Sequence, residues 1–272
     1  MTHPSQDPAQ WSADFIEEFD GPELDPGRWL PYYLPQWSSR ARTAPRHRMS
    51  ESTLVLQIDA DQAPWSPEFD GQIKTTAIQT GVFSGPVGSS IGQCRFTDGL
   101  VVREAQEPRR LYTPHRGYIE TRLRAIDHPR AMVALWMIGY EDEPERSGEI
   151  CMVEIFGRDV GADRALVGMG IHPFHDPTLV DDFSRVPLQI DATDYHVYAV
   201  DWSDSRVDFY ADHTLVRTVE QSPNYPMQLM LGVYEFPPDG DDEAPADYPF
   251  EFVVDYVRGW SRRSEAGAPS TP

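Results

Sequence analysis

The sequence predicts an all-β fold, a jelly-roll sandwich of two antiparallel sheets. Short segments alternate apolar and polar side chains with a period of two, and turns rich in Gly, Pro and Asp separate them. Helical periodicity is scarce, and the 272 residues contain no internal repeat and no central linker. Many period-2 segments at short spacing are typical of a sandwich built as one domain.

The predicted strands follow one another along the whole chain. Residues 54–59 and 118–123 place apolar side chains at every second position, and residues 207–210 do the same. Asp212 and His213 then occupy the turn of a hairpin that returns through Leu215 and Val216. Two further strands, at 227–233 and 250–256, are predicted near the end of the chain by the same alternation.

The ends of the chain differ in composition from the middle. Residues 1–10 and 263–272 are rich in Pro, Ser, Ala and Gly, so we expect flexible tails around a single domain at 11–262. No basic start followed by an apolar core is visible, which leaves a cytoplasmic location as the default expectation. No apolar run approaches the ~20 residues that a membrane-spanning helix requires.

Charge and cysteine content restrict the partners. The chain carries 23 basic and 44 acidic side chains, a formal charge of −21. Nucleic-acid binding needs a basic surface that neutralises phosphate, so that partner is not expected. Cys94 and Cys151 are the two cysteines, too few for a disulfide framework in a chain of this length.

Two acidic residues stand out in one predicted strand. Glu149 and Glu154 lie among apolar residues, where unpaired carboxylates are costly to bury. Regular alternation would place Glu149 and Cys151 on one face and Glu154 on the other. A one-residue bulge near Met152 and Val153 would return Glu154 to the face of Glu149. Without the bulge, one glutamate would point to solvent from an edge strand.

The bulge would give the two acids a chemical use. It makes their separation four strand positions, roughly 13 Å between Cα atoms at ~3.3 Å per position. Side chains leaning toward each other could then bring the carboxyl groups to about 5–5.5 Å, the separation found in retaining glycosidases. In that mechanism one carboxylate attacks the sugar and the other protonates the departing oxygen.

A series of short blocks in the same order resembles glycoside hydrolase family 16, in its laminarinase-like form. The signature Glu-x-Asp-x-x-Glu of that family matches residues 149–154, except that Cys151 stands where the family has Asp. The resemblance runs roughly from Phe15 to Trp260. The other blocks lie at residues 19–29, 116–123, 134–138, 196–202, 224–227 and 254–258.

The resemblance implies a concanavalin A-like β-jelly roll and endo-hydrolysis of a β-linked polysaccharide, either a β-1,3-glucan or a related glucan or galactan. Glu149 would attack the anomeric carbon to form a covalent glycosyl-enzyme, and Glu154 would be the acid and base. A neutral thiol at Cys151 would hold Glu149 less firmly and remove a negative charge near Glu154. We therefore expect activity that is weak or shifted to lower pH, unless Cys151 is only a small buried apolar residue.

Five residues are candidates for sugar binding. Trp136 would more often be a core residue, but the resemblance places it in the sugar cleft, where its flat face suits a pyranose. Trp37 and Arg40 belong to an aromatic cluster at residues 32–40 and either form a subsite or pack within a loop. Tyr234 ends a predicted strand. His172 is interpreted as a partner of sugar hydroxyls, in preference to a zinc ligand.

Loops rich in proline and aromatic residues, at 61–71 and 237–249, are expected to wall the binding site or to cover a sheet edge. No cofactor is required for the expected chemistry. The resemblance adds a structural calcium at Asp255, since calcium is bound by several oxygen atoms.

The expected partner is a polysaccharide or oligosaccharide, bound by a monomer without nucleic acid or membrane. Relatives are usually secreted, which conflicts with the missing signal peptide. Two alternatives stay open: a non-catalytic carbohydrate-binding protein on the same fold, and a polysaccharide lyase.

Overall fold

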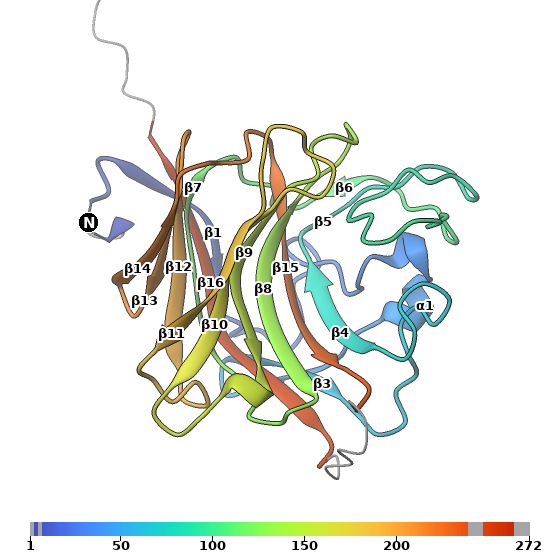
Figure 1. Cartoon of the computed structure of the whole chain (residues 1–272), viewed down its shortest axis with the longest axis horizontal. Coiled ribbons are helices and arrows are strands. Elements are labelled where there is room, and N and C mark those ends of the chain that lie inside the picture. The colour runs from blue at the N-terminus through green and yellow to red at the C-terminus, as the bar shows by residue number, and fades with distance from the viewer. Residues whose placement is uncertain (1–2, 5–6, 239–246, 264–272) are drawn as a thin grey trace, which may run out of the picture.

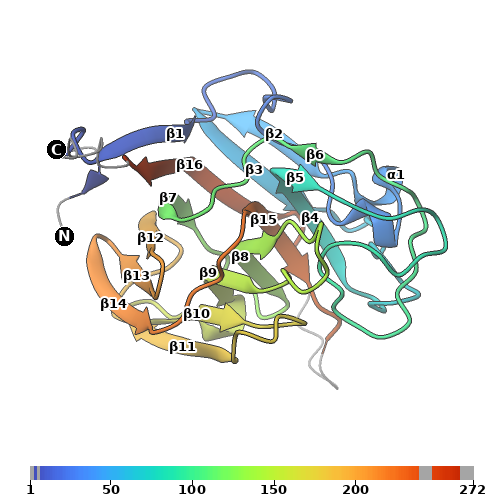
Figure 2. The same ribbon diagram turned by 90° about the horizontal axis from the view of Figure 1, so that it is seen from above.

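The structure is a computed structural model, and it describes residues 3–4, 7–238 and 247–263. Two large antiparallel sheets pack face to face, which confirms the predicted sandwich (Figure 1). Figure 2 shows the two sheets as neighbouring curved layers. Among the described residues, no helix has both the length and the apolar character needed to cross a membrane.

The larger sheet has eight strands. Strand β1 (Trp11–Glu17) pairs with β16 at one side of it, off the main path. Along the path the order is β14 (Thr214–Val219), β13 (Val207–Ala211), β12 (His196–Trp202), β7 (Gly117–Arg124), β16 (Phe250–Arg262), β3 (Thr53–Ile58) and β2 (Arg46–Ser50).

The second sheet has six strands and carries the two glutamates of interest. Its order is β11 (Asp182–Leu188), β10 (Ala165–His172), β9 (Glu149–Phe156), β8 (Ala131–Gly139), β15 (Met227–Glu235) and β4 (Lys74–Gln79). The smaller elements are β5 (Gly81–Val82) paired with β6 (Arg109–Arg110), the helix α1 (Arg40–Thr43), and the 3₁₀ turns η2 (Pro35–Trp37) and η3 (Gly157–Asp159).

The main core fills the space between the sheets. Ile119 and Leu123 from β7 meet the same apolar cluster as Val133 and Leu135 from β8, and none of the four is exposed. Because strand side chains alternate, Glu120 and Arg122 on β7 and Ala134 on β8 point away from this core. Side chains on the outward faces of the two sheets can therefore form binding sites.

The hairpin predicted at Asp212 is confirmed. Asp212 and His213 both have positive φ angles, 45° and 63°, and connect β13 to β14. This left-handed backbone is typical of a two-residue turn whose twist matches the strands.

The start of the chain differs from the expected loose tail. Trp11 is bonded to Asp7 through its backbone, and Arg263 is bonded to Gln10 in the same way. His3 lies on the eight-stranded sheet, with its ring nitrogen 2.7 Å from a carboxylate oxygen of Glu120. The predicted tail after Arg263 lies outside the described residues.

Candidate active site

Strand β9 contains the predicted bulge. Cys151 pairs with Trp136 on β8, but the next pair on these strands joins Val153 to Leu135, so Met152 has no opposite residue. The pairing with β10 shows the same extra residue. Met152 and Val153 both point into the core between the sheets. The irregularity therefore returns Glu154 to the side of the sheet that faces away from the core.

One cavity of about 260 Å³ brings the proposed catalytic residues together. Glu149, Cys151 and Glu154 all line it, and so do Trp136 and Tyr234. The loop predicted to wall the site contributes Asp70, whereas most of the second proline-rich loop lies outside the described residues. The remaining lining residues are Tyr33, Ile73, Cys94, Phe96, Met132, Ala134 and Phe236.

Small residues on both neighbouring strands make room for Glu154. Ala134 is its partner on β8, and Gly168 is its partner on β10. A Cβ atom on Gly168 would lie 2.5 Å from the ring of Phe183 and 3.1 Å from the Cβ of Glu154. A side chain at this position would therefore displace the ring of Phe183 and crowd Glu154.

Burial dominates the electrostatics of Glu149. It raises the pKa of this carboxyl group to about 8, and the negative charge of Glu154 adds to the rise. Burial also raises the pKa of Glu154, but positive charges on His172, Arg185 and Arg158 oppose that effect. In the sugar-free cavity, the surroundings thus favour a proton on Glu149, and they raise the pKa of Glu154 with these positive charges limiting the rise.

Cys151 lies between the two glutamates as a neutral thiol. Burial raises its pKa well above the ordinary value, and the charges of Glu149 and Glu154 raise it further. Its Sγ atom lies 3.9 Å from the carbonyl oxygen of Gly168. A neutral, weakly hydrogen-bonding group therefore lies between the two carboxyl groups.

The backbone just before Glu149 is held by a pair of buried side chains that the sequence did not reveal. The hydroxyl of Tyr225 accepts a hydrogen bond from Gly148 N at 2.7 Å and donates one to Asp176 at 2.6 Å. A Cβ on Gly148 would lie 2.5 Å from that hydroxyl oxygen. Tyr225 and Asp176 therefore fix where β9 begins.

Trp37 and Arg40 do not line this cavity, so of their two predicted roles the packing within a loop fits their contacts and the sugar subsite stays a prediction. Trp37 is 0% exposed, and its indole N–H donates to the carbonyl of Gln93 at 2.8 Å, so no face is open to a sugar. Arg40 points to the surface, where it bonds Gln106 and pairs with Glu104. Both residues support the loop.

The aromatic cluster of that loop reaches the cavity through a neighbouring residue. Tyr33 lines the cavity, and its hydroxyl shares a hydrogen bond with Tyr234. The rings of Tyr33 and Tyr234 meet edge to face at 5.7 Å between centroids. The sequence singled out Trp37 in this cluster, but the path of the loop turns Tyr33 toward the glutamates.

His172 lies beside the cavity and does not line it. It is the partner of Glu149 on β10, so both side chains lie on the same side of the sheet. Its ring nitrogen is 2.6 Å from a carboxylate oxygen of Asp181, and the ring stacks on Phe183. His172 therefore influences Glu154 through its charge, while contact with a sugar stays a prediction.

The surroundings of Asp255 do not favour calcium. Its carboxylate already pairs with a cation, the guanidinium group of Arg122. Among the described residues, the only group of three side chains with suitable metal-ligating atoms lies elsewhere. We therefore derive no step from calcium.

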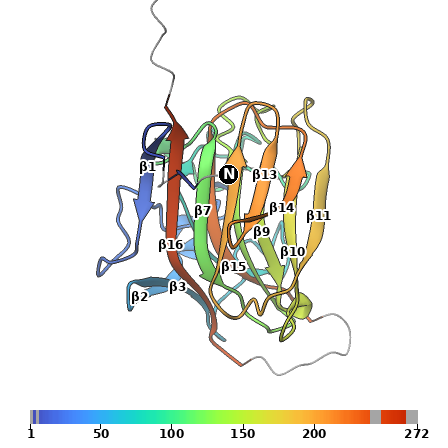
Figure 3. The ribbon, with the colours of Figure 1, turned by 90° about the vertical axis from the view of Figure 1, so that its left-hand side faces the viewer.

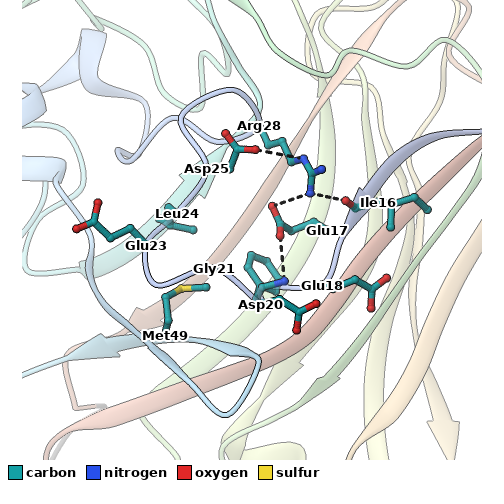
Figure 4. Close-up of a pocket in the computed structure, with 11 residues that line it drawn as sticks. Ile16, Glu17, Glu18, Asp20, Gly21, Glu23, Leu24, Asp25, Arg28 and Met49 are labelled. Atoms are coloured by element: carbon teal, nitrogen blue, oxygen red, sulfur yellow. Dashed lines mark hydrogen bonds and ion pairs between the residues drawn. The ribbon is translucent and has the colours of Figure 1, made fainter.

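A second, acidic cavity of about 400 Å³ lies where the chain leaves β1 (Figure 4). Three of its five acids, Glu17, Glu18 and Asp25, have partners in the protein. Glu17 accepts from the backbone of Phe19 and pairs with Arg28, which also pairs with Asp25. Glu18 forms two hydrogen bonds to Arg258. Carboxylates paired in this way do not by themselves form a cation site.

Comparison with known proteins gives a family match and a set of similar folds. The family model described as glycosyl hydrolases family 16 matches residues 112–257, which is more than half of the chain. That segment contains Glu149, Cys151, Glu154 and Trp136. The comparison with curated proteins found no match.

Three solved structures share the fold. A GlcNAcα1-4Gal-releasing endo-β-galactosidase from Clostridium perfringens is 28% identical with a TM-score of 0.77, and the alignment covers 93% of this chain but only 63% of that one. A laminarinase from a Flavobacterium species is 20% identical, with a TM-score of 0.62 and coverage of 92% and 100%. The catalytic domain of an endo-1,3-β-glucanase from Thermotoga petrophila is 17% identical, with a TM-score of 0.65 and coverage of 93% and 99%.

Proposed function

The chain belongs to glycosyl hydrolases family 16 and is a glycoside hydrolase; from this premise we propose that it cleaves a β-linked polysaccharide internally and with retention. The observation that supports this most strongly is the bulge at Met152. It leaves Glu149 and Glu154 on one wall of the same cavity, four strand positions apart when counted along β8. Glycosidases of both kinds, retaining and inverting, use two carboxyl groups, and we propose the retaining kind because four strand positions allow the side chains to approach to about 5–5.5 Å, the separation that retention requires.

In the proposed mechanism, Glu149 and Glu154 act in turn on one glycosidic bond. Glu149 attacks the anomeric carbon while Glu154 protonates the departing oxygen, which leaves a covalent glycosyl-enzyme. Glu154 then takes a proton from water, and the water displaces Glu149 from the sugar. Trp136 and Tyr234 offer aromatic surface against which the sugar can lie.

The protonation of the empty cavity sets a condition on this mechanism. Glu149 has to be ionised to attack, yet its surroundings raise its pKa to about 8. From the sequence we expected activity at lower pH, and that expectation considered only the effect of Cys151 on Glu154. Burial of Glu149 shifts the activity to higher pH instead, because Glu149 becomes ionised, and so able to attack the sugar, only as the pH rises toward that value.

We propose a β-glucan or β-galactan as substrate, with β-galactosidic linkages tested first. The C. perfringens enzyme is the most similar of the three structures in sequence, and its name describes release of a disaccharide by an endo-β-galactosidase. The laminarinases are similar in fold. This chain spans only 63% of the C. perfringens chain, so the activity of that enzyme is not evidence for the activity of this one. Activity on galactosides is therefore part of the proposal.

Product release and binding, measured on the same polymers, test the function. Galactose-containing β-glycans and laminarin are incubated with the protein and with the variant Glu149→Gln, and reducing ends are counted while retention of each polymer is measured by affinity electrophoresis. The proposal expects oligosaccharide products from the natural protein and binding without products from the variant. Binding without products from both would instead support the non-catalytic carbohydrate-binding protein.

A further inference from the structure

We propose that the outer face of the eight-stranded sheet binds a divalent transition metal, Zn²⁺ by the chemistry of its ligands, through His3, Glu120 and His213. Each residue offers one ligand atom, and the three atoms all lie within 4.8 Å of one another. His3 Nε2 is 2.7 Å from Glu120 Oε2, and the rings of His3 and His213 are 5.6 Å apart between centroids. The inference does not rest on the proposed glycosidase activity, because the face lies on the other sheet.

The sheet fixes Glu120 at the centre of this group. Glu120 is on β7, where its neighbours Ile119 and Thr121 point into the sandwich and leave its own side chain on the outer face. Its partner on β12 is Ala199, whose short side chain leaves space above the sheet. Although it is on the outer face, Glu120 is only 1% exposed, because side chains from other segments cover it.

His213 is presented by the tight turn between β13 and β14. The turn is held by the side chain of Asp212, which accepts a hydrogen bond from Val197 N at 2.9 Å and lies 2.7 Å from a ring nitrogen of His196. The left-handed conformation of His213 follows from its place in this turn. The residue is therefore positioned by the backbone while its ring stays exposed.

His3 reaches the same place from the start of the chain. Its ring packs edge to face on Tyr118 and Trp260, at 5.4 Å from each ring centroid. Figure 3 looks onto this side of the molecule, where β16, β7 and β13 are labelled. Two histidines about 210 positions apart in the sequence thus meet over one buried carboxylate.

The donor set suits zinc better than the cations that prefer oxygen. Two imidazoles and one carboxylate form a recognised set for Zn²⁺ that leaves a fourth position open for water. Calcium takes six to eight oxygen ligands, and one carboxylate does not supply them. Zinc bonds of ~2.0–2.2 Å require ligand atoms about 3.3 Å apart, so the exposed ring of His213 has to move inward by roughly an ångström.

One cation already lies near the site. Arg258 Nη1 is 3.7 Å from Oε1 of Glu120, the oxygen that His3 does not contact. Arg258 is committed mainly to Glu18, with two hydrogen bonds of 2.7 and 2.8 Å. Oε2 of Glu120 is therefore the oxygen that would bind the metal, and the formal charge of −21 on the chain favours the approach of a cation.

A bound metal would fasten the start of the chain to the sheet. His3 precedes β1 by eight positions, Glu120 lies on β7, and His213 lies in the turn between β13 and β14 of the same sheet. A ligand that binds only the folded arrangement stabilises it in proportion to the logarithm of its concentration. The metal would therefore act as a structural clamp at a distance from the glutamate cavity.

Titration of the whole protein with Zn²⁺ tests the proposal. Protein freed of metal with a chelator is titrated by calorimetry, and Co²⁺ replaces Zn²⁺ in a second titration followed by visible absorption. The variants are His3→Ala and His213→Ala, with His47→Ala as the control because His47 is an exposed histidine on β2 outside the group. Thermal unfolding with and without Zn²⁺ shows whether each variant folds.

We expect one Zn²⁺ per chain, with affinity reduced by about 10-fold or more in each ligand variant and unchanged in His47→Ala. Zn²⁺ should raise the melting temperature of the natural protein and of His47→Ala, but not of the two ligand variants. Absence of 1:1 binding, or equal affinity in all four proteins, would overturn the proposal. Because His3 and His213 are tested separately, failure of one variant to fold still leaves the other to decide.

Discussion

Cys151 on β9 faces Trp136 on β8 in the last regular pair before the register shifts at Met152. Glu149 lies two positions before this pair, and Glu154 lies three positions after it. In a regular strand, a side chain two positions from Cys151 and a side chain three positions from it would lie on opposite faces of the sheet. The single unpaired residue cancels that difference, and both carboxylates line the cavity beside Trp136.

Deletion of Met152 should therefore preserve the site. The shortened strand would alternate regularly, with Cys151 and Glu154 two positions apart, as are their partners on β8 and β10. We expect measurable hydrolysis, with stability lower by about 2–5 kcal/mol because a buried methionine side chain is lost.

Deletion of Ile150 is the matched control. It removes another fully buried apolar residue from the same strand, but it turns Glu149 away from the face that carries Glu154. Activity should be lost, while thermal unfolding shows a folded protein. Equal activity in the two deletion variants would contradict the role given to the bulge.

The value of kcat/KM should increase as the pH rises toward 8. This parameter reports the ionisation of groups in the free enzyme. Glu149 has to lose its proton before it can attack, and burial raises the pKa of its carboxyl group to about 8. Ionised Glu149 is the attacking form, so activity falls as the pH drops below that value. A profile that is flat from pH 5 to pH 8 would show that Glu149 is already ionised.

Replacement of Cys151 tests why the pKa of Glu149 is high. In Cys151→Asp the introduced carboxyl group can share a proton with Glu149, and in Cys151→Asn the amide can donate a hydrogen bond without a charge. We expect the rising limb of the pH profile to move to lower pH in both variants. Profiles that coincide with that of the natural protein would leave Cys151 as a small buried residue only.

Trp136 and Trp37 should respond differently to the same substitution. Trp136→Phe reduces the aromatic surface in the cavity, and a loss of about 0.5–1.5 kcal/mol in sugar contact predicts a fall in kcat/KM of roughly 2- to 10-fold. Trp37→Phe removes the hydrogen bond to Gln93 and should lower the melting temperature with kcat/KM unchanged. The reverse pattern would return Trp37 to the sugar site.

Tyr225→Phe should loosen the start of β9. The change leaves the Gly148 N–H and the Asp176 carboxylate without their shared partner, at a cost of about 1–3 kcal/mol in the free energy of unfolding. Because Glu149 follows Gly148 directly, kcat should fall more than KM changes. Chemical denaturation beside steady-state kinetics measures both, and a variant with full stability and kcat would remove Tyr225 from this role.

The sequence was informative where function depends on one strand. The spacing of Glu149 and Glu154 predicted the bulge because alternation and buried charge conflict without it. In the loop at residues 32–40, composition did not distinguish Tyr33 from Trp37, because the path of the loop decides which ring reaches the cavity.

Contacts between distant segments left no signal in the sequence. Tyr225 meets Gly148 across 77 positions, and His3 meets Glu120 across 117. Neither pair belongs to a local pattern, so only the arrangement of the sheets reveals it. The charge pairing of Asp255 with Arg122 is likewise a product of neighbouring strands, and calcium at Asp255 stays a prediction.

Chemical trapping tests most directly whether Glu149 and Glu154 act on one bond. The protein is incubated with 2-deoxy-2-fluoro β-glycosides of galactose- and glucose-based disaccharides that carry a reactive leaving group, and its peptides are analysed by mass spectrometry. The account predicts one sugar attached to Glu149, retained longer in Glu154→Gln because the base for its hydrolysis is missing, and absent in Glu149→Gln. Attachment to Glu154, or turnover with inversion at the anomeric carbon and no attachment, would contradict it.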